Sequence, residues 1–117
     1  MKVKVSELQG AALDWAVALI EYPEWKEQGY LEVFPHDLSF DDGTTYTPST
    51  DWSQGGPIIE REGISVAMDD VEPWCGFIED DEINTLFFSG PTPLIAAMRC
   101  YVASKLGDEI ELPEEVK

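Results

Sequence analysis

Positive charge is scarce in this sequence. Seven Lys and Arg residues stand against 24 Asp and Glu residues, which gives a formal net charge of −17 at pH 7. A chain with this balance repels nucleic acids and anionic membrane surfaces, because both carry dense negative charge. We therefore expect no direct binding to DNA or RNA. A basic protein surface would be attracted, although high net charge also serves simply to keep a small protein soluble.

Residues that bind metals are few as well. The chain has one histidine, His36, and two cysteines, Cys75 and Cys100, which are far apart in the sequence. A zinc site needs about four closely spaced Cys, His or carboxylate ligands. We therefore expect no metal and no cofactor. In a cytosolic chain, two distant cysteines favour reduced, buried thiols over a disulfide.

Long apolar runs are absent. No stretch approaches the roughly 20 apolar residues that cross a bilayer, and Lys2 and Lys4 are not followed by the apolar segment of a signal peptide. These features predict a cytoplasmic protein without membrane contact. With 117 residues, of which 44% are hydrophobic and 11% aromatic, the chain is long enough for one domain with its own core.

Hydrophobic spacing predicts a first amphipathic helix near the N-terminus. After a short strand at Val3 and Val5, apolar residues from Leu8 to Ile20 recur at helical intervals. Ser6 is the expected N-cap, and Gln9, three residues later, would complete a capping box. The helix should end before Pro23.

A second helix is predicted over residues 92–106, with Thr92 as N-cap, Pro93 in the first turn and Gly107 as the stop. Between the helices, residues 58–88 alternate in the manner of an antiparallel meander. The fold class expected is α+β: two amphipathic helices packed on a small meander in a single domain of residues 1–117. Within it, residues 23–57 form an irregular, aromatic-rich segment and residues 108–117 an acidic tail.

One candidate ligand site is the segment from Tyr46 to Pro57, which is dense in hydroxyl groups. Adjacent glycines let a ligand approach the backbone, a tryptophan offers a flat face for stacking, and carboxylate and amide groups can recognise polar edges. The alternative is a turn-rich connection whose tryptophan lies in the core. The residues assigned to ligand binding here are Asp51, Trp52, Gln54, Gly55 and Gly56.

A second candidate is the start of the second helix. Gly90 precedes Thr92, and unpaired N–H groups at a helix N-terminus attract anions. Arg99 lies about two turns further on and, with Arg61, is one of the few cations. We include Gly90, Thr92 and Arg99 in the ligand-binding hypothesis. The alternative is a well-capped helix with no ligand and arginines that form salt bridges.

Clustered carboxylates form the third feature. Residues 69–82 contain no Lys or Arg, and spaced carboxylates can face a basic partner. Solvated turns explain the same cluster without any partner. No calcium-binding loop signature is present. The acidic residues assigned to a partner surface are Asp69, Asp70, Glu79, Asp80, Asp81 and Glu82.

Three stretches together resemble the NinX family of lambdoid phages and prophages in their order, their spacing and the identity of their residues. They are Val5–Ala18, Ser49–Glu60 and Gly90–Arg99. The second reads Ser-Thr-Asp-Trp-Ser-Gln-Gly-Gly-Pro-Ile-Ile-Glu, and the resemblance spans most of the chain. It implies a phage accessory protein in the cytoplasm of a bacterial host. It implies no particular activity, so no catalytic or binding residue is carried over from the family.

Catalysis finds little support, because no nucleophile or metalloprotease signature is present. We therefore expect a protein that is not an enzyme. The first hypothesis is a binding module that sequesters a small nucleotide-like host signal, and the alternative is an acidic antagonist that docks on a basic host protein.

Overall fold

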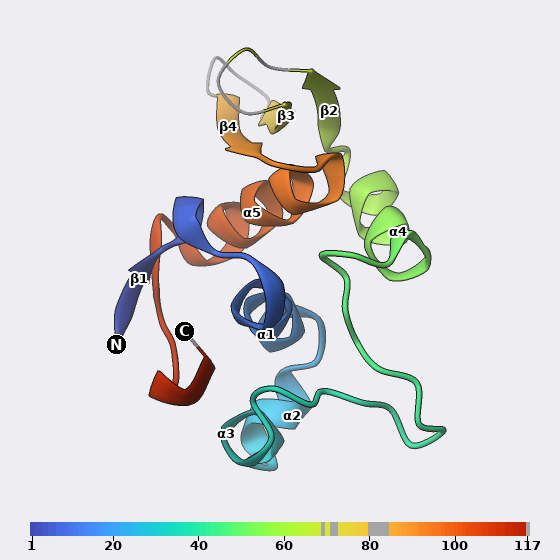
Figure 1. Cartoon of the computed structure of the whole chain (residues 1–117), viewed down its shortest axis with the longest axis vertical. Coiled ribbons are helices and arrows are strands. Elements are labelled where there is room, and N and C mark those ends of the chain that lie inside the picture. The colour runs from blue at the N-terminus through green and yellow to red at the C-terminus, as the bar shows by residue number, and fades with distance from the viewer. Residues whose placement is uncertain (69, 71–72, 80–84, 117) are drawn as a thin grey trace.

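The computed structural model describes residues 1–68, 70, 73–79 and 85–116. It contains helices and a short antiparallel sheet that packs on one of them, α5 (Figure 1), which confirms the α+β class. The helices are α1 (Gly10–Glu21), α2 (Pro23–Glu27), α3 (Tyr30–Val33), α4 (Trp52–Glu62) and α5 (Pro93–Leu106). The strands are β1 (Lys2–Lys4), β2 (Ser65–Met68), β3 (Trp74–Glu79), β4 (Thr85–Gly90) and β5 (Glu109–Glu111), with 3-10 turns η1 (Val5–Glu7) and η2 (Glu114–Val116).

Helix α5 occupies the centre of the molecule, with the sheet on one side, α1 on the other and α4 at its first turns (Figure 1). The predicted boundaries are confirmed: Thr92 Oγ1 accepts the N–H of Ile95 at 3.1 Å, and the helix stops at Gly107. Residues 94 and 96–103 are all buried. A helix that is apolar on nearly every side belongs in an interior, and α5 forms the inner layer of the fold.

Strands β2, β3 and β4 form the expected antiparallel meander, in the order β2-β3-β4. Two of its glycines set the distance to α5. A Cβ atom added to Gly76 or Gly90 would lie 2.9 or 2.7 Å from backbone atoms of Ala96. Only a residue without a side chain allows this approach, so the sheet can lie directly on the helix backbone. Away from the meander, β1 pairs with β5 and joins the two ends of the chain.

The start of α1 differs from the prediction. Ser6 lies inside η1 and caps no helix, and α1 begins at Gly10 after an extended Gln9 that makes no side-chain cap. The cause is local. Gly10 has φ +58°, which side-chain-bearing residues rarely adopt, and the turn before it buries Val5 and Leu8 completely or nearly so.

Residues 52–62 also differ from the prediction, which placed a loop up to Pro57 and a strand at Ile58 and Ile59. They form α4. Asp51 caps the helix by accepting the N–H of Ser53 at 2.9 Å, and Gly63, at φ +69°, ends it. Two good caps and the burial of Ile58 outweigh the low helix propensity of the glycines.

The segment expected to be irregular contains α2 and α3 and is fixed by aromatic contacts. The rings of Tyr22 and Trp25 stack with centroids 4.6 Å apart, and Phe40 and Tyr46 meet both of them at 5.3–6.0 Å. Such ring pairs contribute beyond their buried area. They compensate for the shortness of the helices here.

Cys75 and Cys100 are both buried and unpaired, which confirms the expectation of buried thiols instead of a disulfide. Burial raises the pKa of the Cys100 thiol to about 12, so this group stays protonated and unreactive. Among the described residues, no helix has the length and apolar character needed to cross a membrane.

Two adjacent glycines of α4 allow a test of this packing. A Cβ atom on Gly55 would lie 2.5 Å from the carbonyl oxygen of Pro48 and 2.6 Å from Leu94, whereas one on Gly56 would meet only Trp52 at 3.9 Å. We expect Gly55→Ala to lower the free energy of unfolding by about 1–3 kcal/mol through overpacking. Gly56→Ala should raise it by up to about 1 kcal/mol through helix propensity. Urea denaturation measures both, and equal effects would contradict the packing described here.

Candidate functional site

A pocket of about 320 Å³ opens between the first turns of α1 and the segment 35–50. This volume is at the lower end of the range for small-molecule sites. Its floor includes Gly10, Ala11 and Asp14 from α1, and its walls come from residues 35–38, 45–47 and Thr50. The pocket therefore joins a regular helix to the aromatic-rich segment that packs against it.

Asp14 is the distinctive group in this pocket. Its side chain is only 6% exposed, and its Oδ1 accepts the main-chain N–H of Ser49 at 2.8 Å. Among the described residues no donor hydrogen-bonds to Oδ2. The hydroxyl of Ser49 is buried close enough to the carboxylate to stabilise its charge, although it makes no hydrogen bond of regular geometry. A buried carboxylate with an unused oxygen at a pocket wall is a ready acceptor for a ligand's N–H or O–H group.

Burial raises the pKa of the Asp14 carboxyl, while the hydroxyl and amide of Ser49 act in the opposite direction. The charged form is therefore held at a cost in solvation free energy. Carboxylates kept in this condition are over-represented at functional sites, although structural networks also produce them. Because Asp14 also lines a pocket, a functional role is favoured here over a purely structural one.

The first turn of α1 supplies the opposite kind of group. No side chain caps this helix, because Gln9 is extended and its side chain makes no cap hydrogen bond. The first N–H groups of an α-helix have no partner within the helix and carry the positive end of its dipole. Gly10 and Ala11, which belong to that turn, both line the pocket. The pocket thus lies where the start of a helix meets a buried carboxylate.

Gln54, one of the predicted ligand residues, supports the pocket from behind. Its Oε1 accepts the N–H of Thr47 at 2.6 Å and its Nε2 donates to the carbonyl of Thr45 at 2.7 Å. Asp51 is engaged as the cap of α4. The polar groups of both residues are thus used within the protein, and Gln54 acts by holding the wall formed by residues 45–47.

The other predicted residues of this segment divide in the same way. Trp52 is 53% exposed on the first turn of α4, so its ring is open to solvent as stacking would require, but it does not line the pocket. Gly55 is buried against Pro48 and Leu94, and Gly56 is partly exposed. Through Gly55 and Leu94 the first turns of α4 and α5 meet, so the two predicted loops are neighbours.

At the start of α5, the predicted residues have structural contacts. Gly90 faces Ala96, and Thr92 caps the helix. Arg99 is 5% exposed; its Nε donates to the carbonyl of Leu8 at 2.7 Å and its Nη1 to that of Ser89 at 2.8 Å. These two bonds tie η1 and β4 to the central helix. At this low exposure, little of the guanidinium group is open to a ligand.

The predicted acidic surface lies largely beyond what the structure describes. Asp69, Asp80, Asp81 and Glu82 are outside the described residues. Asp70 is exposed, and Glu79 is the last residue of β3. In the part of the chain that is described, no group of three or more His, Cys, Asp or Glu side chains is placed to hold a metal ion.

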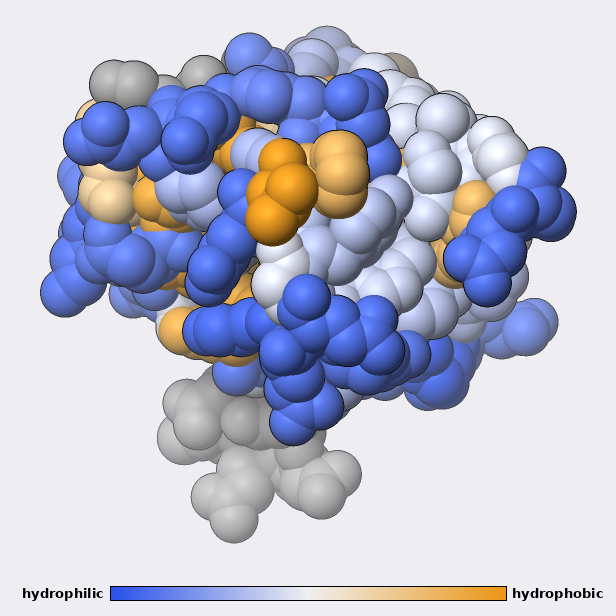
Figure 2. Space-filling view, turned by 90° about the horizontal axis from the view of Figure 1, so that it is seen from below, coloured by the Kyte–Doolittle hydropathy of each residue, from blue (hydrophilic) through white to orange (hydrophobic). Residues whose placement is uncertain are grey.

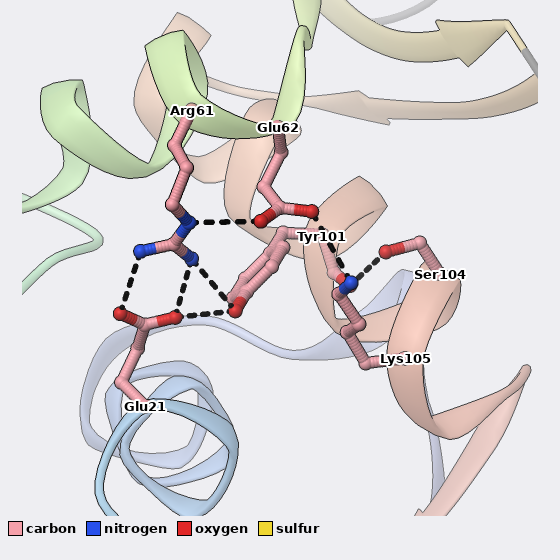
Figure 3. A network of polar contacts seen from close by, with 6 residues as sticks. All are labelled: Glu21, Arg61, Glu62, Tyr101, Ser104 and Lys105. Carbon is pink, nitrogen blue, oxygen red and sulfur yellow. Dashed lines mark hydrogen bonds and ion pairs between the residues drawn. The ribbon is translucent and has the colours of Figure 1, made fainter.

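A polar network joins the ends of three helices, as Figure 3 shows. Arg61 of α4 makes a two-pronged pair with Glu21 of α1, at 3.1 and 2.6 Å, and its Nε also donates to Glu62 at 2.9 Å. The hydroxyl of Tyr101 donates to Glu21, and Lys105 pairs with Glu62 at 3.2 Å. Arg61 therefore forms the salt bridges that the sequence left open as one of its two roles.

Burial acts to raise the pKa of Glu21, but the hydrogen bonds from Arg61 and Tyr101 and the nearby positive charge outweigh it, so the pKa is lowered. Burial and the neighbouring Glu21 raise the pKa of Tyr101. The network is thus ionised on the carboxylate and neutral on the phenol at neutral pH. Its part is to fix α4 against α1 and α5.

These features define the class of protein. It is a small α+β domain in which a buried carboxylate, Asp14, lines a pocket and uses one of its two oxygens in a hydrogen bond. The family described as Bacteriophage P22, NinX matches residues 4–105, nearly the whole chain, and the protein belongs to this phage family. This confirms the resemblance noted in the sequence. Comparison with curated proteins gave no match.

The buried charge of Asp14 should lower the free energy of unfolding at neutral pH. Because its pKa is raised above the ordinary 3.8, the folded state binds the proton more tightly than the unfolded state and loses stability as pH rises through that interval. Asp14→Asn keeps an acceptor for Ser49 and removes the charge. We expect it to raise the free energy of unfolding at pH 7 by about 0.5–2 kcal/mol, with the gain shrinking as pH falls toward 3.8. Urea titrations at several pH values measure this, and a destabilised variant at pH 7 would contradict it.

Proposed function

We propose that the protein is a non-catalytic binding module that holds a small ligand in the Asp14 pocket, in the cytoplasm of a phage-carrying bacterium. The observation that supports this proposal is the position of the Asp14 carboxylate at the pocket wall. One of its oxygens accepts the N–H of Ser49, and the other has no hydrogen-bond donor among the described residues. This second oxygen lies beside an open volume, so it can accept a donor that a ligand supplies.

The pocket chemistry points to a ligand that carries a donor next to an acceptor. Asp14 would accept an N–H group, and the first amides of α1, at Gly10 and Ala11, would donate to a carbonyl or ring nitrogen. The polar edges of nucleobases present such groups side by side. Tyr46, Pro35 and Leu38 add apolar surface around that polar end. The base of a nucleotide-like host signal is therefore the part that this pocket would hold.

The net charge bears on the rest of the ligand. At −17, the protein repels an anion approaching in solution. A nucleoside or a nucleobase derivative fits the pocket better than a nucleotide with several phosphates. The nucleotide-like ligand expected from the sequence is therefore narrowed to the uncharged members of that class, nucleosides and nucleobases.

We propose sequestration without chemistry for a physical reason. A general base that activates a nucleophile must hydrogen-bond to it, and the partner of Asp14 in the structure is the main-chain amide of Ser49 and not a nucleophilic side chain. The histidine at the pocket, His36, is exposed at its rim. The described lining residues supply recognition groups and no oriented nucleophile–base pair.

Titration with nucleosides tests the proposal. Guanosine, adenosine, cytidine and uridine are added singly to the isotope-labelled protein, and amide NMR shifts are followed. We expect at least one nucleoside to move the signals of Gly10, Ala11 and residues 45–50. Asp14→Asn should weaken that binding by about tenfold or more, because a hydrogen bond to a buried charge is lost.

The control is Asp108→Asn, the same chemical change at an exposed position outside this pocket. It should bind as the parent does. Unaltered binding by Asp14→Asn, or no response to any of the four nucleosides, would contradict the proposed ligand class. The Asp14→Asn spectrum itself reports whether the variant is folded.

A further inference from the structure

A second recess lies on the far side of the aromatic-rich segment. It is a groove of about 310 Å³ on the α2–α3 surface, and three aromatic rings line it, those of Trp25, Tyr30 and Phe34. Its other lining residues are Gln28, Gly29, Val33, Ser39 and Asp41. We call it the aromatic groove. It shares no lining residue with the Asp14 pocket.

The rings of the groove are held in place and do not collapse onto one another. Trp25 and Tyr30 meet edge to face with centroids 5.1 Å apart, and Tyr30 and Phe34 are tilted at 5.4 Å. The hydroxyl of Tyr30 accepts the N–H of Ser39 at 2.8 Å and lies 3.0 Å from the carbonyl of Asp37, to which it can donate. These contacts fix the orientation of the central ring and leave ring surface facing the groove.

The groove combines polar and apolar surface, and two of its hydrophobic residues are exposed to solvent. Val33 is 66% exposed and Phe34 is 50% exposed, two of the most exposed large hydrophobic residues described. Figure 2 views this end of the molecule and shows hydrophobic patches set within a largely hydrophilic surface. Aromatic side chains exposed beside a recess are typical of interaction sites.

The stretch that forms the groove is rich in negative charge, and one of its carboxylates, that of Asp41, lines the groove itself. Six exposed carboxylates come from α2, α3 and the segment that follows, and Lys26 is the one cation on the same stretch of residues 23–45. Aromatic faces attract cations, and acidic surroundings strengthen that attraction while repelling anions. The acidic residues are Glu24, Glu27, Glu32, Asp37, Asp41 and Asp42.

We propose that the aromatic groove docks an arginine side chain from a basic segment of a partner protein. The guanidinium group stacks on aromatic faces and pairs with carboxylates, and its alkyl stem covers apolar surface of the kind that Val33 offers. This inference goes beyond the small-ligand function. It assigns the contact with a basic partner to the aromatic groove on α2 and α3, whereas the sequence suggested residues 69–82.

The test uses a defined probe, the end-blocked peptide Gly-Arg-Leu-Arg-Gly, and the same peptide with citrulline in place of arginine. Citrulline keeps the shape and removes the charge. NMR titration follows the indole N–H of Trp25 and the amides of residues 30–34. We expect those signals to move with the arginine peptide, and the citrulline peptide to bind at least about fivefold more weakly.

Two variants separate the groove from general attraction between opposite charges. Phe34→Ala should weaken the arginine peptide about threefold, while Phe87→Ala, at a residue equally exposed (52%) on β4, should leave it unchanged. Asp41→Asn, which keeps the ring packing, should weaken binding about twofold. Equal affinity of the two peptides, equal effects of the two phenylalanine variants, or shifts confined to other surfaces would each overturn the proposal.

Discussion

The close approach of the sheet to α5 is the constraint on which the rest of the structure depends. Ala96 and Ala97 on the helix face Gly76 and Gly90 on the strands, with no room for a Cβ atom between them. Interiors packed at this density have little freedom to adjust. With α5 fixed on one side by the sheet, its other sides receive α1, α4 and η1, and Arg99 binds η1 and β4 to it.

This arrangement explains where binding surfaces can form. The core around α5 is filled by helices and strands, and the chain between α3 and α4 is left to pass over the outside of α1. Three contacts hold it there: the aromatic cluster, the Gln54 bonds to residues 45–47, and the bond between Asp14 and Ser49. This segment contributes residues 35–38, 45–47 and 50 to the Asp14 pocket and Phe34, Ser39 and Asp41 to the aromatic groove, and the two share no lining residue.

The elements with clear local signals could be predicted from the sequence. Thr92, Pro93 and Gly107 delimit α5, and alternation identifies the meander. Helix α4 could not be predicted in this way, because two glycines and a proline resemble a loop, whereas the caps at Asp51 and Gly63 and the burial of Ile58 make it helical. The first turn of α1 was misplaced because burial of Leu8 and the positive φ of Gly10 override the capping signal of Ser6.

The candidate site was harder to predict than the fold. Asp14 lies in the run Ala-Leu-Asp-Trp-Ala, and a single carboxylate among apolar residues is the only local sign that it has a special role. Its partner Ser49 is 35 residues away, so their hydrogen bond could not be predicted from the sequence. Arg99 appeared to be a cation for an anionic ligand, yet its guanidinium is buried against carbonyl groups. Sequence alone shows which groups are present, and the packing of α5 decides which of them remain available.

The central claim is that Asp14 faces a ligand, and the most direct measurement is native mass spectrometry of the protein purified gently from bacteria that produce it. The account predicts a small-molecule adduct that is lost on unfolding and absent from Asp14→Asn. A protein that always appears at its sequence mass, or an adduct that persists in Asp14→Asn, would contradict it.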